Sequence, residues 1–188
     1  MIGLNGFGIS NRIINDRVIR TARRKGPLMR SEQEVNQAIE QYADMVLRLC
    51  AVSLKNTADA EDVFQTVFLK YTLSNQIFET AEHEKAWLIR VTVNCCRDLL
   101  KNLFRKRTVS LEEIAEYSVQ PASEQSAVLE AVRSLPQKYR EVVYLHYYEG
   151  YTAPEIAGIL HQNPNTVYTH LSRARELLKE MLGGAADE

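Results

Sequence analysis

Apolar residues recur at helical spacing along most of the chain, and no segment alternates strictly between apolar and polar residues over the length of a strand. This pattern predicts an all-α protein. Helices are expected over about 31–52, 58–73, 84–105 and 137–148, with a shorter helix that ends at Ser134 and two more helices between residues 151 and 181.

The last two predicted helices form a helix-turn-helix pattern in which each helix has a start signal. Thr152 and Glu155 have the three-residue spacing of a capping box, in which a hydroxyl and a carboxylate satisfy free amides of the first turn. Asn163 stands at the N-cap position of the second helix, and Pro164 follows at its first helical position. The apolar stripe of this second helix is Val167, Leu171, Ala174, Leu178 and Met181.

The other side of that last helix carries hydrogen-bonding side chains near its N-terminal half. These are Asn165, Thr166, Tyr168, Thr169, Ser172 and Arg173. A DNA-binding helix-turn-helix presents such groups to base edges in the major groove. An ordinary helical hairpin would show the same capping signals with a merely solvated face, and we favour the DNA-reading interpretation of the two.

The helix expected over 58–73 has an acidic outer face. Asp59 and Asp62 lie on it, together with Thr66 and the apolar residue Leu69. An acidic face is commonly only solvated. The leucine beside the carboxylates favours a contact with another protein.

A basic stripe follows one face of the helix expected over 84–105. Its members are Arg90, Asn94, Arg97, Lys101 and Arg105. Attraction of cations to the C-terminal end of the helix dipole accounts for the last turn only. Because the stripe extends well beyond that turn, we interpret it as a phosphate-binding surface.

Charge is distributed unevenly along the 188 residues, whose net charge is −1. A protein that binds DNA unaided usually carries a positive field, so this balance indicates a DNA reader that depends on a partner. Residues 1–30 are rich in arginine and lack a long apolar period, which predicts a flexible basic arm. Residues 108–125 are acidic and polar, and they form the expected linker between two small helical domains at 31–107 and 126–182.

The three cysteines suit a reducing compartment better than a disulfide framework, because their number is odd and two are adjacent. An enzyme or metal sensor would have to use them with His83, His146, His161 and His170. None of these residues has a recognised ligand spacing, and the chain has neither a glycine-rich phosphate loop nor a nucleophile elbow. We therefore expect no cofactor, no metal and no active site. No apolar run approaches the roughly 18 residues that span a bilayer, and no secretory signal is evident, which favours a cytoplasmic protein.

Three stretches carry a more specific signal. They are DAEDVFQTVFLK at 59–70, KAWLIRVTVNCCRDLLKNLFRKR at 85–107, and LPQKYREVVYLHYYEGYTAPEIAGILHQNPNTVYTHLSRAREL at 135–177. In this order and spacing they resemble the sigma-70 family of RNA polymerase initiation factors, in its small extracytoplasmic-function (ECF) group. The resemblance implies two helical domains on a flexible linker and a transcription initiation factor that directs core RNA polymerase to promoters. A stand-alone dimeric helix-turn-helix regulator would explain the last stretch but neither the acidic helix nor the basic stripe.

The resemblance also implies where polymerase binds. In that family the acidic helix of the first domain docks on the clamp helices of the polymerase's largest subunit. The matching positions are Asp59, Asp62, Gln65 and Phe68. A contact with the flap of the second-largest subunit and binding by an anti-sigma factor are implied in the same way.

Two promoter elements follow from the resemblance as well. The basic stripe and the loop before it are expected to recognise and open the minus-10 element, with Asn75 holding an extruded base. Residues 164–175 are expected to read the minus-35 element. The chain departs from the family at His161, where glycine is usual in the turn, and at Tyr168 and His170, where basic residues are common. Fewer cations predict weaker phosphate clamping and an unusual minus-35 sequence.

Overall fold

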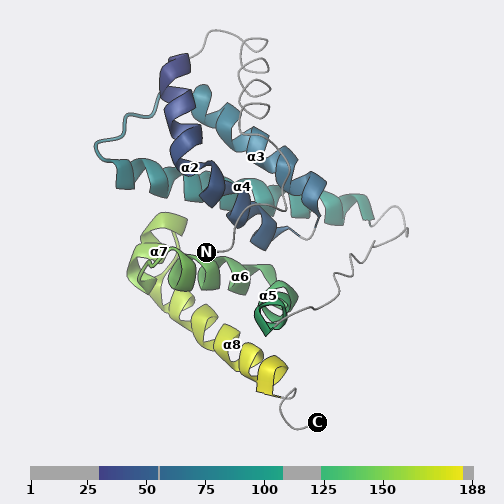
Figure 1. Cartoon of the computed structure of the whole chain (residues 1–188). Helices are drawn as coiled ribbons and strands as arrows, with labels where there is room; N and C mark the ends of the chain where they lie inside the picture. The colour runs from purple at the N-terminus through teal and green to yellow at the C-terminus, as the bar shows by residue number, and fades with distance from the viewer. Residues whose placement is uncertain (1–29, 55, 108–123, 184–188) are drawn as a thin grey trace. The chain divides into compact units, whose positions relative to one another are not determined.

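The computed structural model describes residues 30–54, 56–107 and 124–183 (Figure 1). In these residues the chain is helical and contains no strand, which confirms the all-α prediction. The elements are α2 (Glu32–Ser53), α3 (Thr57–Thr72), α4 (Ala81–Arg107), α5 (Glu124–Ser134), α6 (Gln137–Val143), a π-helical turn (Tyr144–Tyr148), α7 (Ala153–Leu160) and α8 (Pro164–Gly183).

The chain divides into two compact units. Of the described residues, the first unit holds 30–50 and 56–95, and the second unit holds 51–54, 96–107 and 124–183. The C-terminal part of α4 therefore belongs to the second unit.

Three helices enclose the core of the first unit, where α2 and α3 lie against α4 (Figure 1). The stripe that the sequence predicts for α2 is buried and consists of Val35, Ile39, Tyr42, Val46 and Leu49. From α3 come Phe64 and Phe68, whose ring centroids lie 4.9 Å apart. Full burial of an apolar side chain of this size stabilises the fold by about 1.5–3 kcal/mol.

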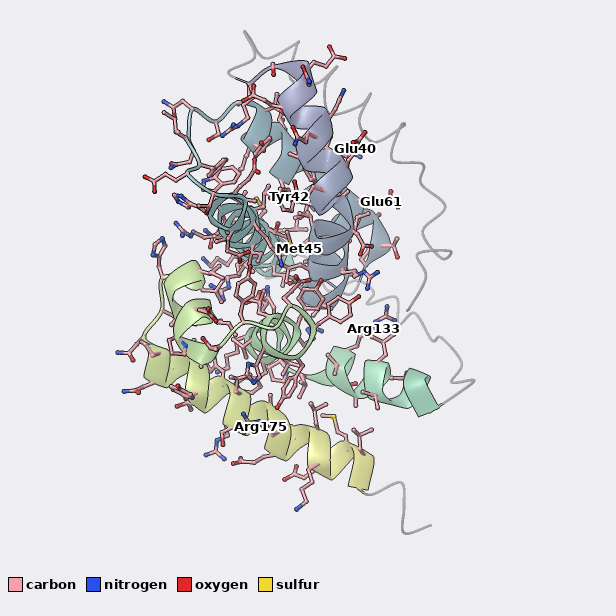
Figure 2. All side chains as sticks on the ribbon, turned by 60° about the vertical axis from the view of Figure 1, so that its left-hand side comes forward. Glu40, Tyr42, Met45, Glu61, Arg133 and Arg175 are labelled. Carbon is pink, nitrogen blue, oxygen red and sulfur yellow. The ribbon has the colours of Figure 1, made fainter. Side chains whose placement is uncertain are left out.

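One carboxylate ties the three helices of this unit together. Tyr42 of α2, labelled in Figure 2, donates to the carbonyl of Ala81 at 3.1 Å and to Oε2 of Glu84 at 3.3 Å. Tyr71 of α3 donates to Oε1 of the same Glu84. Burial, followed by the Glu84 charge, raises the pKa of Tyr42 to about 12, so this hydroxyl stays protonated and remains a donor.

α8 is the central helix of the second unit and packs against α5, α6 and α7. Its buried residues are Val167, Leu171 and Ala174, the first part of the predicted stripe. Ala174 lies in a cluster with Leu135 and Val143, and Leu178 packs at its edge. Met181 is exposed, so the stripe leaves the core before the helix ends.

The single helix predicted over 137–148 is interrupted in the structure. α6 ends at Val143, and a π-helical turn follows, in which the amide of Glu149 donates to the carbonyl of Tyr144 at 3.1 Å. The turn leaves Tyr147 and Tyr148 exposed. Gly150, at a φ of 81°, then makes the expected turn into α7, in a conformation that favours glycine.

Candidate nucleic-acid interface

The helix-turn-helix begins with the capping box that the sequence predicts. The backbone amide of Thr152 donates to Oε2 of Glu155 at 2.7 Å, and the amide of Glu155 donates back to the Thr152 hydroxyl at 3.4 Å. The hydrogen bonds from Thr152 hold the pKa of Glu155 below its ordinary value. α7 thus begins at a defined residue, and its first turn keeps a negative charge where the helix dipole favours one.

His161 makes the turn between α7 and α8 in a left-handed conformation, with φ 52° and ψ 48°. The amide of Gln162 donates to the carbonyl of Ala157 at 2.9 Å, and the amide of His161 donates to the carbonyl of Gly158 at 3.4 Å. This pair of bonds is a Schellman motif, whose left-handed position is usually glycine. The histidine occupies a strained position that the sequence had marked as a departure from the family.

α8 begins at Pro164, and the side chain of Asn163 accepts a 2.9 Å hydrogen bond from the amide of Asn165. This is the N-cap that the sequence predicts. The six residues expected to face DNA are all exposed on α8: Asn165, Thr166, Tyr168, Thr169, Ser172 and Arg173. Their side chains are available to a ligand from the side of α8 opposite the buried stripe.

Two of these six side chains already have partners within α8. The hydroxyl of Thr169 donates to the carbonyl of Asn165 at 2.8 Å. Arg173 pairs with Glu176 at 2.7 Å. The Arg173 pair is exposed, so its contribution to stability is small and the arginine can exchange partners at little cost.

Arg175, the last residue of the range 164–175 expected to read the minus-35 element, is an exposed cation that the sequence prediction does not single out (Figure 2). Its Nε donates to the hydroxyl of Tyr147, in the π-helical turn, at 2.9 Å. Arg175 follows Tyr168 by two helical turns, so it lies on nearly the same side of α8. That spacing could have identified it as a further cation of the surface.

His170, which stands where the family commonly has a basic residue, lies against the ring of Tyr139 with centroids 5.4 Å apart. Burial lowers its pKa, and the charges of Lys138 and Arg97 lower it further. The lowered pKa favours the neutral ring, which supports the expectation that α8 has fewer cations for phosphate than is usual.

The acidic face of α3 is only partly as expected. Asn56 caps the helix by accepting from the amide of Ala58 at 2.9 Å. Asp62 is exposed, and Asp59 and Gln65 are half-buried. Phe68 is 0 % exposed, so it belongs to the core of the unit and is not available for direct contact with polymerase. The family resemblance, and not helical spacing, assigns Phe68 to this face; Phe68 follows Phe64 by four residues and lies with it on the buried side of α3.

The basic stripe of α4 is continuous along the helix, but its members differ in their surroundings. Asn94 and Lys101 are exposed, whereas Arg90 and Arg97 are half-buried. Lys101 lies 3.7 Å from the carboxylate of Asp98. The side chain of Arg105 lies outside the described residues.

Arg97 is engaged within the second unit in a way that the sequence did not indicate. Its Nη2 donates to Oε2 of Glu141 at 2.7 Å, and Gln137 donates to the other carboxylate oxygen at 2.9 Å. Glu141 is fully buried. Burial raises the pKa of Glu141, and the neighbouring Arg97 and Gln137 act against that rise. The guanidinium of Arg97 therefore stabilises a buried charge besides any role toward DNA.

The loop between α3 and α4 exposes three consecutive side chains, Asn75, Gln76 and Ile77. Ile77 is 82 % exposed. Two contacts hold the loop around this triplet: the amide of Gln76 donates to the Ser74 hydroxyl at 3.1 Å, and Phe78 lies against Trp87 at a centroid distance of 5.7 Å. Trp87 thus packs within the unit, and the side chain of Asn75 in the loop is exposed.

Arg30, which the sequence assigns to the flexible arm, is instead attached to this loop. Its amide donates to the carbonyl of Thr72 at 3.3 Å, and its guanidinium lies 4.4 Å from the ring centroid of Tyr71. The arm prediction is therefore wrong for residue 30, because the aromatic rings that hold it come from residues distant in sequence. Residues 1–29 lie outside the described residues.

Among the described residues no three or more histidine, cysteine, aspartate or glutamate side chains are grouped so as to hold a metal ion. None of the helices formed by these residues is both long and apolar enough to cross a membrane.

Comparison with known proteins supports the resemblance to the sigma-70 family. The family described as Sigma-70 region 2 matches residues 38–107, and the family described as Sigma-70, region 4 matches residues 125–178. The RNA polymerase sigma factor SigV of Bacillus subtilis (strain 168) is 30% identical over 137 residues, which cover 72% of this chain and 82% of that protein. The ECF RNA polymerase sigma factor SigE of Mycolicibacterium smegmatis is 29% identical over 165 residues, which cover 81% of this chain and 63% of SigE.

A solved structure shows the same fold. The sigma factor RpoE from Bartonella quintana, determined in complex with the anti-sigma factor NepR, superposes with a TM-score of 0.66 at 22% sequence identity. The superposition covers 80% of this chain and 98% of RpoE.

The structure is that of a helical protein of two units, of which the second ends in a helix-turn-helix with an exposed polar face on α8. The chain belongs to the sigma-70 family of RNA polymerase sigma factors, in its ECF group. It is a transcription initiation factor that directs RNA polymerase to promoters. A stand-alone regulator is not favoured, because the region 2 match over 38–107 has no part in that alternative.

Proposed function

We propose that the protein divides promoter recognition between two functional domains, at 31–107 and 126–182, which residues 108–125 link. The positions of the two family matches support this division. The observation that carries the proposal is the exposed polar face of α8, which follows a capped helix-turn-helix as a major-groove reader requires.

The minus-35 element is read by α8 in this proposal. Asn165, Thr166 and Ser172 offer short hydrogen-bonding groups to base edges, and Thr169 offers a methyl group. Arg173 can leave Glu176 for a phosphate or a guanine edge, because both partners are exposed. Tyr168 and Arg175 lie at the edge of this surface.

The minus-10 element is bound by α4 and by the loop before it. Asn75 holds an extruded base through its amide, which can donate to and accept from a base edge. Arg90, Asn94 and Lys101 follow the backbone of the opened DNA. Arg97 and Arg105 complete the stripe, although Arg97 must share its guanidinium with Glu141.

Core RNA polymerase docks on the acidic face of α3. Asp59, Asp62 and Gln65 present two carboxylates and an amide to the clamp helices of the largest subunit, and Asp62 is the most accessible of the three. The second functional domain contacts the flap of the second-largest subunit. The chain has no active site of its own, since the polymerase performs the catalysis, and it acts in the cytoplasm with that enzyme.

An anti-sigma factor is proposed as a further partner. The support is that RpoE, which shares the fold, was determined in complex with the anti-sigma factor NepR. With a net charge of −1, the protein is expected to need polymerase for promoter binding. An inhibitor that keeps it from polymerase would therefore also keep it from promoters.

Transcription from a pool of genomic fragments tests the proposal. Core polymerase with the protein should produce discrete transcripts that core polymerase alone does not produce. The same fragments should show negligible sequence-specific binding by the free protein in gel shifts at physiological salt. Tight specific binding by the protein alone, without any change in transcription, would show that it acts as a stand-alone regulator.

A further inference from the structure

Arg30 makes an unusual set of contacts for a residue that precedes the first described helix. Its guanidinium carbon lies 4.4 Å from the ring centroid of Tyr71 and 4.8 Å from that of Phe78. Its Nη2 donates to the carbonyl oxygen of Gln76. The side chain is only 11% exposed, and it also lies 3.8 Å from the carboxylate of Glu34.

These contacts join the two ends of the loop between α3 and α4. Tyr71 lies in the last turn of α3, and Phe78 lies shortly before α4. Their rings are nearly parallel, with an interplanar angle of 3° and centroids 6.2 Å apart. A cation near both ring faces is attracted to each of them, and the attraction is stronger where water is excluded.

The hydrogen bond to Gln76 fixes the middle of the loop. Asn75, Gln76 and Ile77 are exposed, so side-chain packing does not hold this triplet. The Gln76 carbonyl is held by a charged donor, and such bonds are stronger than those between neutral groups. Arg30 therefore restrains the backbone directly beside Asn75.

We propose that Arg30 is a positioning residue for minus-10 recognition, which holds the loop in the conformation that lets Asn75 receive an extruded base. This inference rests on the proposed function of Asn75. An ordered loop loses less conformational entropy when the base binds, so the correct base gains affinity without a direct contact from Arg30.

Lysine cannot reproduce these contacts, although it keeps the charge. It lacks the planar group that lies against two rings while it donates to a carbonyl. Arg30→Lys is therefore the informative substitution. Arg48→Lys is the matched control, because Arg48 is also in the first unit but its Nε pairs with Asp44 at 2.9 Å within α2.

The test combines hydrogen exchange with promoter discrimination. In the full-length protein, Arg30→Lys should accelerate exchange of the amides of residues 74–78 by about tenfold, and Arg48→Lys should not. With core polymerase, Arg30→Lys should reduce discrimination among bases at the extruded minus-10 position by about tenfold, while its discrimination at minus-35 stays unchanged. A loss of fold alone would weaken both elements together.

Asn75→Ala distinguishes the base-holding role of Asn75 from the positioning role of Arg30. If Asn75→Ala loses minus-10 discrimination and Arg30→Lys keeps it, the positioning role is overturned and the function of Asn75 stands. If neither variant changes discrimination, both are overturned. Should Arg30→Lys fold poorly, Phe78→Leu removes one of the two rings and keeps Arg30, and the same loss at minus-10 is expected.

Discussion

The hydroxyl of Thr169 donates to the carbonyl of Asn165, 2.8 Å away and one turn earlier on the exposed side of α8. Its hydrogen is therefore committed to the helix, and a base cannot accept it without breaking that bond. The hydroxyl oxygen can still accept a hydrogen bond, and the methyl group is the other part of this exposed side chain that a base could meet, since methyl groups contact the methyl of thymine.

Two substitutions of Thr169 distinguish the methyl group from the hydroxyl. Thr169→Val keeps a methyl and removes the hydroxyl, whereas Thr169→Ser does the reverse. We expect Thr169→Ser to reduce discrimination at the contacted minus-35 base by about fourfold, which is about 0.8 kcal/mol. Thr169→Val should change this discrimination by no more than about twofold from that of the unaltered protein. Transcription from promoters with each base at that position measures both, and the opposite order would show that the hydroxyl reads the base.

Asp62→Lys tests the docking of polymerase. Because Asp62 is exposed, the substitution should leave the free energy of unfolding nearly unchanged. Like-charge repulsion should raise the Kd for core polymerase at least tenfold, which is about 1.4 kcal/mol. Glu40→Lys, an equal charge change on an exposed position of α2, is the control (Figure 2). A fluorescence titration in which both variants bind core like the unaltered protein would remove α3 from the interface.

Lys101→Ala is the cleanest probe of the basic stripe. Arg97→Ala would leave the buried Glu141 without its guanidinium, which costs about 3–5 kcal/mol and confounds any DNA assay. Lys101 pairs with Asp98 at 3.7 Å, but both side chains are exposed and such a pair contributes little to stability. Removal of the lysine should therefore leave folding unaffected.

If Lys101 contacts one phosphate, its loss should lower the salt slope of open-complex formation by about 0.7–0.9. The effect should be equal at all promoters. Lys138→Ala, which removes an exposed lysine on α6, should leave the slope unchanged. A promoter-dependent effect of Lys101→Ala would assign base reading, and not phosphate binding, to this lysine.

His161→Gly should stabilise the protein. His161 has a φ of 52° in the turn of the helix-turn-helix, and a left-handed conformation costs a non-glycine residue about 1–2 kcal/mol. The greater freedom of glycine in the unfolded chain offsets part of this gain, so we expect about 0.5–1 kcal/mol in urea unfolding. Gly150→Ala should instead lower the free energy of unfolding. Its cause would be the backbone strain of alanine at φ 81°, because an added Cβ would meet no neighbouring atom. Destabilisation by His161→Gly would mean that its imidazole makes a stabilising contact.

Much of this architecture could be predicted because it depends on local patterns. The capping box of Thr152 and Glu155, the N-cap at Asn163 and the burial of Val167 and Leu171 all follow from spacing along one or two helices. The exposed polar face of α8 follows from the same periodicity.

What could not be predicted depends on contacts between segments distant in sequence. Phe68, which the family resemblance assigns to the polymerase contact, is buried in the core of its unit. Arg30 looks like part of a basic arm until Tyr71 and Phe78 are placed beside it. The bond between Arg97 and Glu141 joins residues 44 positions apart, and no short-range pattern reports it.

In the proposed function, the loop at Asn75 reads the minus-10 element and α8 reads the minus-35 element. The most direct measurement is transcription by core polymerase with Asn75→Ala or Thr169→Ala, from promoters altered in one element at a time. We predict that Asn75→Ala changes preference only among minus-10 variants and that Thr169→Ala changes preference only among minus-35 variants. If Thr169→Ala shifted minus-10 preference while Asn75→Ala shifted minus-35 preference, the two surfaces would be assigned to the wrong ends of the promoter.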